Sequence, residues 1–182
     1  MVASHFDLPK VKTLLAEHPE LLNENAEWIE TPIQAAAHVN NREIAEYLLE
    51  QGAPLDICTA AVLGRAEDVR AFLAEDPGLS EARGAHNLGV LFFPALAGNI
   101  EIAEILHAAG AAINPELGQS PLIGAILGGH VRMARWLLDR DADAYATDFE
   151  GHTTLDLARK HEQQEMIDLL LPFFPDEVDA EP

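Results

Sequence analysis

The sequence contains little cysteine and little positive charge. Its single cysteine, Cys58, excludes an internal disulfide and favours a reducing compartment. Only 11 Lys and Arg residues stand against 31 Asp and Glu residues, which gives a formal net charge of −20 at pH 7. Such a charge repels nucleic-acid phosphates and anionic membranes, so we expect neither as a partner. It suits another protein with a basic surface, or it is an ordinary solvated acidic surface.

Long hydrophobic runs are also missing. No apolar run reaches the length of a membrane-spanning helix, and the N-terminus, MVASHFDLPKVKTLL, lacks a basic segment followed by a long apolar one. We therefore expect a cytoplasmic protein without a signal peptide. With 182 residues, 48% of them hydrophobic, the chain is long enough for one domain with a continuous core. We expect it to be a monomer.

The patterns of common active sites are absent as well. The chain has no Gly-x-Ser-x-Gly motif, no P-loop and no dinucleotide-binding fingerprint. Its histidines form no His-x-x-x-His pair and there is no Cys-x-x-Cys, so we expect no metal and no cofactor. Cys58 would be a nucleophile only beside a histidine base, which the sequence does not place. We expect no enzyme; a hydrolase or metal-dependent activity using Cys58 or the histidines is the alternative from another class.

Residues 120–143, SPLIGAILGGHVRMARWLLDRDAD, describe one helix–turn–helix unit. Ser120 is a good N-cap, and Pro121 suits the first helical position, where no N–H is needed. Gly128 and Gly129 permit a sharp reversal between two helices. Apolar residues recur at helical spacing on both sides of that turn: Leu122, Ala125, Ile126, Val131, Ala134, Leu137 and Leu138. Two helices this short cannot bury their faces alone and need stacked neighbours.

Further copies of this plan lie along the chain. We expect residues 1–5 to be frayed and helices to span residues 6–17, 31–39, 42–51, 66–74, 91–97, 100–109, 153–160 and 163–171. Asp56 is expected to cap another helix directly. Residues 19–30 and 77–88 are expected to be long connections.

These residues resemble the ankyrin repeat, whose signature is T-P-L-H-x-A-A, a Gly-His turn and a closing G-A-D. The closest copy begins Thr31-Pro32-Ile33-Gln34 and closes with Gly52-Ala53. The resemblance covers residues 6–171 and implies an all-α ankyrin-repeat solenoid of five to six helix-turn-helix units with short β-turn or hairpin connections. We expect one repeat domain over residues 1–171, with a truncated unit 6–30, units 31–56, 57–84, 85–114 and 115–147, and a C-terminal unit 148–171. Residues 172–182 are expected to form an acidic, disordered tail.

A larger period of 58 residues is also present. It relates Val11 to Val69, Leu15 to Leu73, Pro19 to Pro77, Ala37 to Ala95, Asn41 to Asn99, Glu43 to Glu101 and Gly52 to Gly110. Residues 6–56 and 64–114 therefore look like two copies, a first and a second block, of one two-unit plan. The usual turn before the first helix is missing in the third unit, so we expect a gap there in the row of hairpins. That gap is either drift after duplication or a notch shaped for a partner.

Pro94 departs most from the repeat pattern. A proline inside a helix removes one backbone hydrogen bond and clashes with the preceding turn. We therefore expect this helix to begin near Phe93, with Pro94 in its first turn and Phe92 on a non-helical lead-in. Phe92 and Phe93 form either an ordinary packed pair or an aromatic contact on the concave side.

The resemblance implies a non-catalytic scaffold that binds a protein partner through its hairpin tips and the concave face of the first helices. The positions that correspond to this surface are Glu27, Trp28, Glu30, His38, His86, Leu88, Phe92, Leu96, Glu116, Leu117, Gln119, Phe149, Glu150 and His152. Trp28 and Phe149 either contact the partner or fold back onto neighbouring hairpins. An alternative is an acidic inhibitor or immunity-type protein that blocks a basic nucleic-acid-binding enzyme.

The register of the second helix in residues 120–143 can be tested at Leu137, which it places on the inner face. Replacing Leu137 with Ala should lower the free energy of unfolding by about 2–5 kcal/mol, as for other buried leucines. Chemical denaturation measures the change. A loss below roughly 0.5 kcal/mol, typical of surface sites, would mean that the register is wrong.

Overall fold

The computed structural model describes residues 3–25, 30–116 and 118–175, and within them the regular structure is helical. The α-helices are α1 Ala3–Phe6, α2 Leu8–Glu17, α3 Pro32–His38, α4 Arg42–Glu50, α5 Ile57–Val62, α6 Ala66–Glu75, α7 Phe92–Ala97, α8 Ile100–Ala108, α9 Pro121–Leu127, α10 Val131–Leu138, α11 Thr154–Lys160 and α12 Gln164–Leu170. Four 3₁₀ helices join them: η1 Pro19–Asn23, η2 Pro77–Glu81, η3 Ala85–Asn87 and η4 Leu171–Phe173. No helix of this described part is long and apolar enough to cross a membrane.

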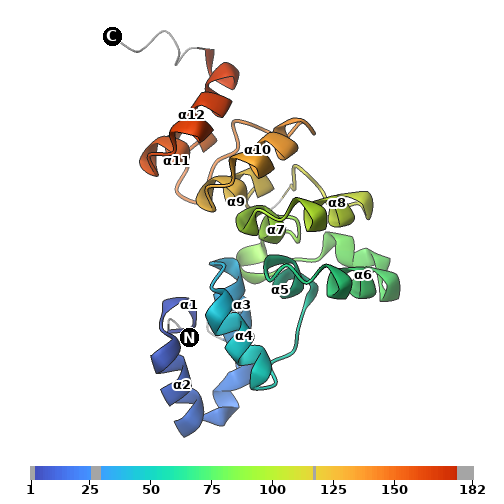
Figure 1. The fold of residues 1–182 in the computed structure, drawn as a ribbon, viewed down its shortest axis with the longest axis vertical. Helices are drawn as coiled ribbons and strands as arrows, with labels where there is room; N and C mark the ends of the chain where they lie inside the picture. Colours follow the sequence, from blue (N-terminus) through green and yellow to red (C-terminus); the bar gives the residue numbers. More distant parts are fainter. Residues whose placement is uncertain (1–2, 26–29, 117, 176–182) are drawn as a thin grey trace.

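The helices pack in pairs, and the pairs stack from the N-terminal to the C-terminal end (Figure 1). The odd-numbered helices α1, α3, α5, α7, α9 and α11 form an inner row in which each contacts the next. The even-numbered helices pack behind them as an outer row. Each pair buries its apolar face against its neighbours, so one continuous core runs through the stack.

Caps set the starts of several inner helices. Ser120 and Asp56 cap α9 and α5 as the sequence predicts, by accepting backbone N–H bonds from Leu122 and Thr59. Thr31 caps α3 through a complete capping box with Gln34. These local bonds explain why helix positions could be read closely from sequence.

The N-terminus differs from the prediction of a frayed end. Residues 3–6 form α1, and Ser4 is buried. The reason is a tether from the next unit, because Asn41 Nδ2 donates a hydrogen bond of 2.9 Å to the backbone oxygen of His5. Asp7 then accepts from the backbone N–H of Lys10 and starts α2. Helix α1 is therefore the short first helix of the first unit.

Helix α7 begins one residue earlier than predicted. Phe92 is its first residue, and Pro94 lies in the first turn, where a missing N–H costs no helical hydrogen bond. Placing Phe92 on a non-helical lead-in was therefore wrong. Phe92 and Phe93 are both buried, and their rings meet edge to face with centroids 6.0 Å apart. They form a packed pair.

The helix bounds repeat with the 58-residue offset found in the sequence. Helices α2 and α6 begin at residues 8 and 66, and α4 and α8 begin at residues 42 and 100. The short helices η1 and η2 begin at residues 19 and 77. In the third unit, only residues 51–56 connect α4 to α5, which confirms the expected gap in the row of hairpins.

Small residues allow the inner helices to approach closely. Alanines at equivalent inner positions are fully buried: Ala36, Ala60, Ala61, Ala95, Ala125 and Ala158. At Gly124 of α9, an added Cβ would lie only 3.0 Å from the backbone oxygen of Phe92. Larger side chains at these positions would push the units apart.

The two asparagines at equivalent caps offer a matched test of the tether to α1. Asn41 and Asn99 cap α4 and α8 in the same way. The side-chain oxygen of each accepts a hydrogen bond from the backbone N–H of the third helical residue, Ile44 or Ile102. Within the described part of the chain, only Asn41 makes a second side-chain hydrogen bond, which it donates to the backbone oxygen of His5. Asn99→Ala should cost about 1 kcal/mol for the lost cap, and Asn41→Ala roughly 1 kcal/mol more for the second bond. Urea denaturation compares them; equal losses would contradict a stabilising tether.

Candidate functional site

Among the residues expected to bind a partner, the structure buries some and exposes others. Glu27, Trp28 and Leu117 lie outside the described residues. The predicted contacts Glu30, Leu88, Phe92, Leu96 and Gln119 are buried, so none of these five side chains is presented to a partner. Those that reach the surface fully or in part are His38, His86, Glu116, Phe149, Glu150 and His152.

Leu88 is buried because of how the connection before α7 folds. Leu88 accepts a backbone bond from Gly84 and donates one to Ala85, so the segment turns back on itself. The turn directs Leu88 into the core beside α7. Sequence alone gives the position of a hairpin but not the direction of this side chain.

The hairpin before α11 keeps its tip exposed. A β-bridge between Thr147 and Thr153 closes the turn, and Asp148 Oδ1 accepts from the backbone N–H groups of Glu150 and His152, both at 2.9 Å. Phe149 stands at this tip with 67% of its surface exposed. The side chain therefore does not fold back onto a neighbouring hairpin.

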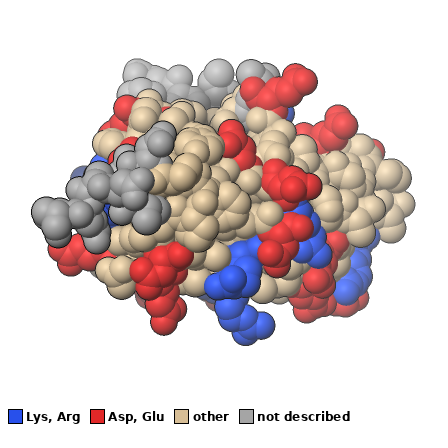
Figure 2. All heavy atoms as spheres, turned by 90° about the horizontal axis from the view of Figure 1, so that it is seen from above, with Lys and Arg blue, Asp and Glu red and all other residues tan. Residues whose placement is uncertain are grey.

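On the face drawn in Figure 2, acidic side chains are spread more widely than basic ones. Seen from above in Figure 2, Asp and Glu side chains occur around most of the visible outline, whereas Lys and Arg lie mainly along the lower edge. This distribution follows from the net charge of −20. The visible face therefore presents several separate acidic groups to an approaching molecule.

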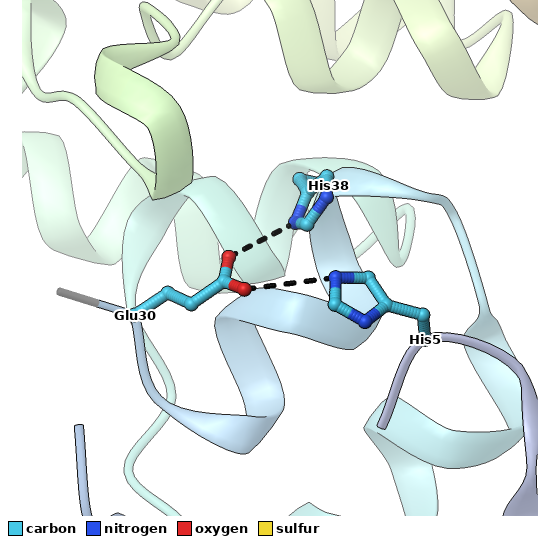
Figure 3. Close-up of side chains that lie close together, drawn as sticks. All are labelled: His5, Glu30 and His38. Carbon is cyan, nitrogen blue, oxygen red and sulfur yellow. Dashed lines mark ion pairs between the residues drawn. The ribbon is translucent and has the colours of Figure 1, made fainter. Parts of the chain in front are cut away.

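A second candidate site is a cluster of histidines around one carboxylate, near the N-terminal end of the stack. Glu30, just before α3, has a side chain only 3% exposed. His5 Nε2 lies 3.6 Å from its Oε1, and His38 Nδ1 lies 3.3 Å from its Oε2 (Figure 3). His86 Nε2, from η3, lies 3.7 Å from the same Oε2. We call these four residues the Glu30 cluster.

Sequence analysis missed the Glu30 cluster, because its members come from four separate segments. His5, Glu30 and His38 each offer one ligand atom, and these atoms all lie within 4.8 Å of one another. The expectation of no metal rested on spacing along the chain. From the sequence, Glu30, His38 and His86 were expected on the partner-binding surface and His5 in a frayed end, so no sequence signal brought the four together.

Cys58 is an improbable nucleophile in this fold. Its thiol is buried in the core, and burial, followed by the charge of Asp56, raises the pKa well above its ordinary value. A protonated, enclosed thiol attacks poorly. The side chain packs with the α5 core instead.

The imidazole of His38 makes stability depend on pH. Burial is the main cause that lowers the pKa of His38 to about 4, and the neighbouring His86 and His5 rings lower it further. A backbone bond with Gln34 raises it, and the Glu30 carboxylate at 3.3 Å favours the same direction. Burial and the two imidazoles dominate, so the ring is neutral at pH 7.

We expect the protein in EDTA to lose stability as the pH falls from about 6.5 towards 4. The pKa of His38 in the folded state lies below the ordinary value of 6.5, so the unfolded chain binds this proton more readily. The full shift corresponds to about 3 kcal/mol. Denaturation at several pH values should show a slope that becomes smaller in His38→Leu. An unchanged slope in that variant would contradict the assignment.

Comparison with known proteins agrees with the stacked architecture. A family model described as ankyrin repeats (3 copies) matches residues 91–180, and a single ankyrin repeat model matches residues 30–60. Among solved structures, an ankyrin repeat domain from Acinetobacter baumannii AYE is 26% identical, with 93% of this chain and 94% of that chain covered and a TM-score of 0.56. A search of curated proteins finds no match. Together with the stacked helix pairs, these matches show that the chain belongs to the ankyrin repeat family.

Proposed function

We propose that this chain is a non-catalytic scaffold that holds a protein partner on its exposed hairpin tips and on the ends of its inner helices. Ankyrin repeats generally mediate protein–protein interaction. A stacked, preformed surface supports the proposal, because little conformational entropy is lost when a rigid surface binds.

The exposure of Phe149 is the observation that carries this proposal. A phenylalanine with 67% of its surface in water gains free energy when a partner covers it. The Asx-type bonds of Asp148 hold the backbone of the tip, so the ring is presented from an ordered turn. Aromatic side chains of this kind are frequent anchors in protein interfaces.

Leu127 adds a second apolar contact on the same side of the repeat plan. It is the last residue of α9 and is 42% exposed, whereas the other apolar residues of that helix are buried. The exposed ends of inner helices and the hairpin tips belong to the surface that the ankyrin resemblance assigns to partners. Phe149 and Leu127 are therefore the proposed apolar anchors.

Charge supports a partner with a basic rim. Glu116 and Glu150 are exposed in the connections before α9 and α11. The net charge of −20 attracts basic proteins over long range and raises their association rate at low salt. An acidic inhibitor of a basic nucleic-acid-binding enzyme is the narrower form of this proposal.

Affinity capture from native lysate tests the proposal with a matched pair of variants. Phe149→Ala should reduce capture of the partner by roughly tenfold or more, as for an interface anchor. Phe6→Ala removes an equally large ring that is 77% exposed in α1, and it should leave capture unchanged. Both variants should keep their unfolding midpoint, because neither ring is in the core.

The salt dependence of the same capture distinguishes the forms of the proposal. Loss of the partner between low and high salt supports recognition through acidic charge, and retention supports apolar recognition. Equal capture by Phe149→Ala and by the natural chain, or no protein retained by either, would contradict binding at the hairpin tips.

A further inference from the structure

One oxygen of the buried Glu30 carboxylate has no hydrogen bond. Its side chain is 3% exposed, and Oε2 has no hydrogen-bond partner. Removing a carboxylate oxygen from water without a partner is costly, and native proteins seldom leave one unpaired. The fold therefore holds a polar atom ready for a ligand that is not part of the protein.

Three imidazoles each have a nitrogen 3.3–3.7 Å from an oxygen of this carboxylate, and the ligand atoms of two of them, His5 and His38, lie within 4.8 Å of one another and of Glu30. Metal–nitrogen and metal–oxygen bonds of about 2.0–2.1 Å put tetrahedral ligand atoms about 3.3–3.4 Å apart. The distances from Glu30 are 3.6 Å to His5 Nε2, 3.3 Å to His38 Nδ1 and 3.7 Å to His86 Nε2. The ligand atoms of His5, Glu30 and His38 lie within 4.8 Å of one another, so binding one ion requires these side chains to move closer together.

We infer that the Glu30 cluster binds one divalent transition-metal ion of the Zn²⁺ class through His5 Nε2, His38 Nδ1 and the Glu30 carboxylate. Two histidines and one glutamate are a donor set that zinc accepts. His86 Nε2 is the candidate for the fourth ligand. The site does not include Phe149 or Leu127, the proposed apolar anchors for a protein partner.

Metal binding would require one hydrogen bond to be exchanged. His38 Nδ1 also lies 3.2 Å from the backbone oxygen of Gln34, so its proton would move to Nε2 to free the lone pair for the metal.

The duplicated block gives an internal comparison for this site. Adding 58 to residues 5, 30 and 38 gives Leu63, Leu88 and Leu96. All three leucines are buried in the core of the second block. The repeat plan therefore accepts apolar side chains at these positions, and packing alone does not explain His5, Glu30 and His38.

The backbone at His86 is held in an unfavourable conformation that directs the ring to Glu30. His86 and Asn87 have φ values of 53° and 61°, which place two successive non-glycine residues in the left-handed region. Gly118 packs against this turn so closely that a Cβ there would lie 2.5 Å from the backbone oxygen of Asn87. Strained conformations of this kind are concentrated at functional sites.

Zn²⁺ titration of the full chain, free of affinity tags and stripped with EDTA that is then removed, tests the inference. Isothermal titration calorimetry should give one Zn²⁺ per chain, and Co²⁺ should give the visible absorption of a tetrahedral site. We expect Glu30→Gln to weaken Zn²⁺ binding at least tenfold. His38→Leu carries the residue found at the equivalent Leu96 and should abolish binding while the circular dichroism spectrum stays helical.

His152→Gln is the matched control, because it alters the other histidine–carboxylate group. Asp148, Glu150 and His152 also present ligand atoms within 4.8 Å of one another, but the bonds within their hairpin already account for Asp148. This variant should bind Zn²⁺ like the natural chain. The inference would be overturned if the natural chain bound no Zn²⁺. It would also be overturned if Glu30→Gln and His38→Leu, while still folded, bound Zn²⁺ as tightly as the natural chain.

Discussion

The close approach of successive inner helices is the constraint on which the rest of the structure depends. Each helix pair is too short to bury its own apolar face, so stability comes from contact between neighbouring units. That contact requires alanine or glycine at the inner positions, as at Ala95, Ala125 and Gly124. Once these positions are fixed, specificity is left to the helix ends and the connections, where the exposed tip and the Glu30 cluster both lie.

The two copies of the duplicated block use the same framework for different purposes. The second block fills its three inward positions with Leu63, Leu88 and Leu96 and gains core. The first block places a buried carboxylate and imidazoles there, which adds little apolar burial and leaves Oε2 of Glu30 unpaired. Buried ionic groups often stabilise less than apolar side chains of similar size. A ligand that satisfies the cluster would explain why this block carries it.

The sequence predicted the helices closely, because their determinants are local. Asp56 and Ser120 start their helices where expected, and the missing hairpin of the third unit was visible in the spacing. Predictions failed where side-chain direction depends on contacts between units. Leu88 is turned inward by the folding of its connection, and α1 is ordered by a bond from Asn41. The residues next to them in sequence do not predict the direction of Leu88 or the ordering of α1.

The Glu30 cluster was beyond sequence reasoning for the same physical reason, since its atoms meet only after four segments have stacked. If the cluster is kept for binding, it is kept at the expense of stability. The most direct measurement is the free energy of unfolding, in EDTA, of a variant with His5, Glu30 and His38 all changed to Leu. We predict a stability equal to or greater than that of the natural chain. Apolar replacement of buried ionic groups is expected to leave stability unchanged or to raise it. A free energy of unfolding lower than that of the natural chain by more than roughly 1 kcal/mol would contradict the claim and show that the cluster stabilises the fold.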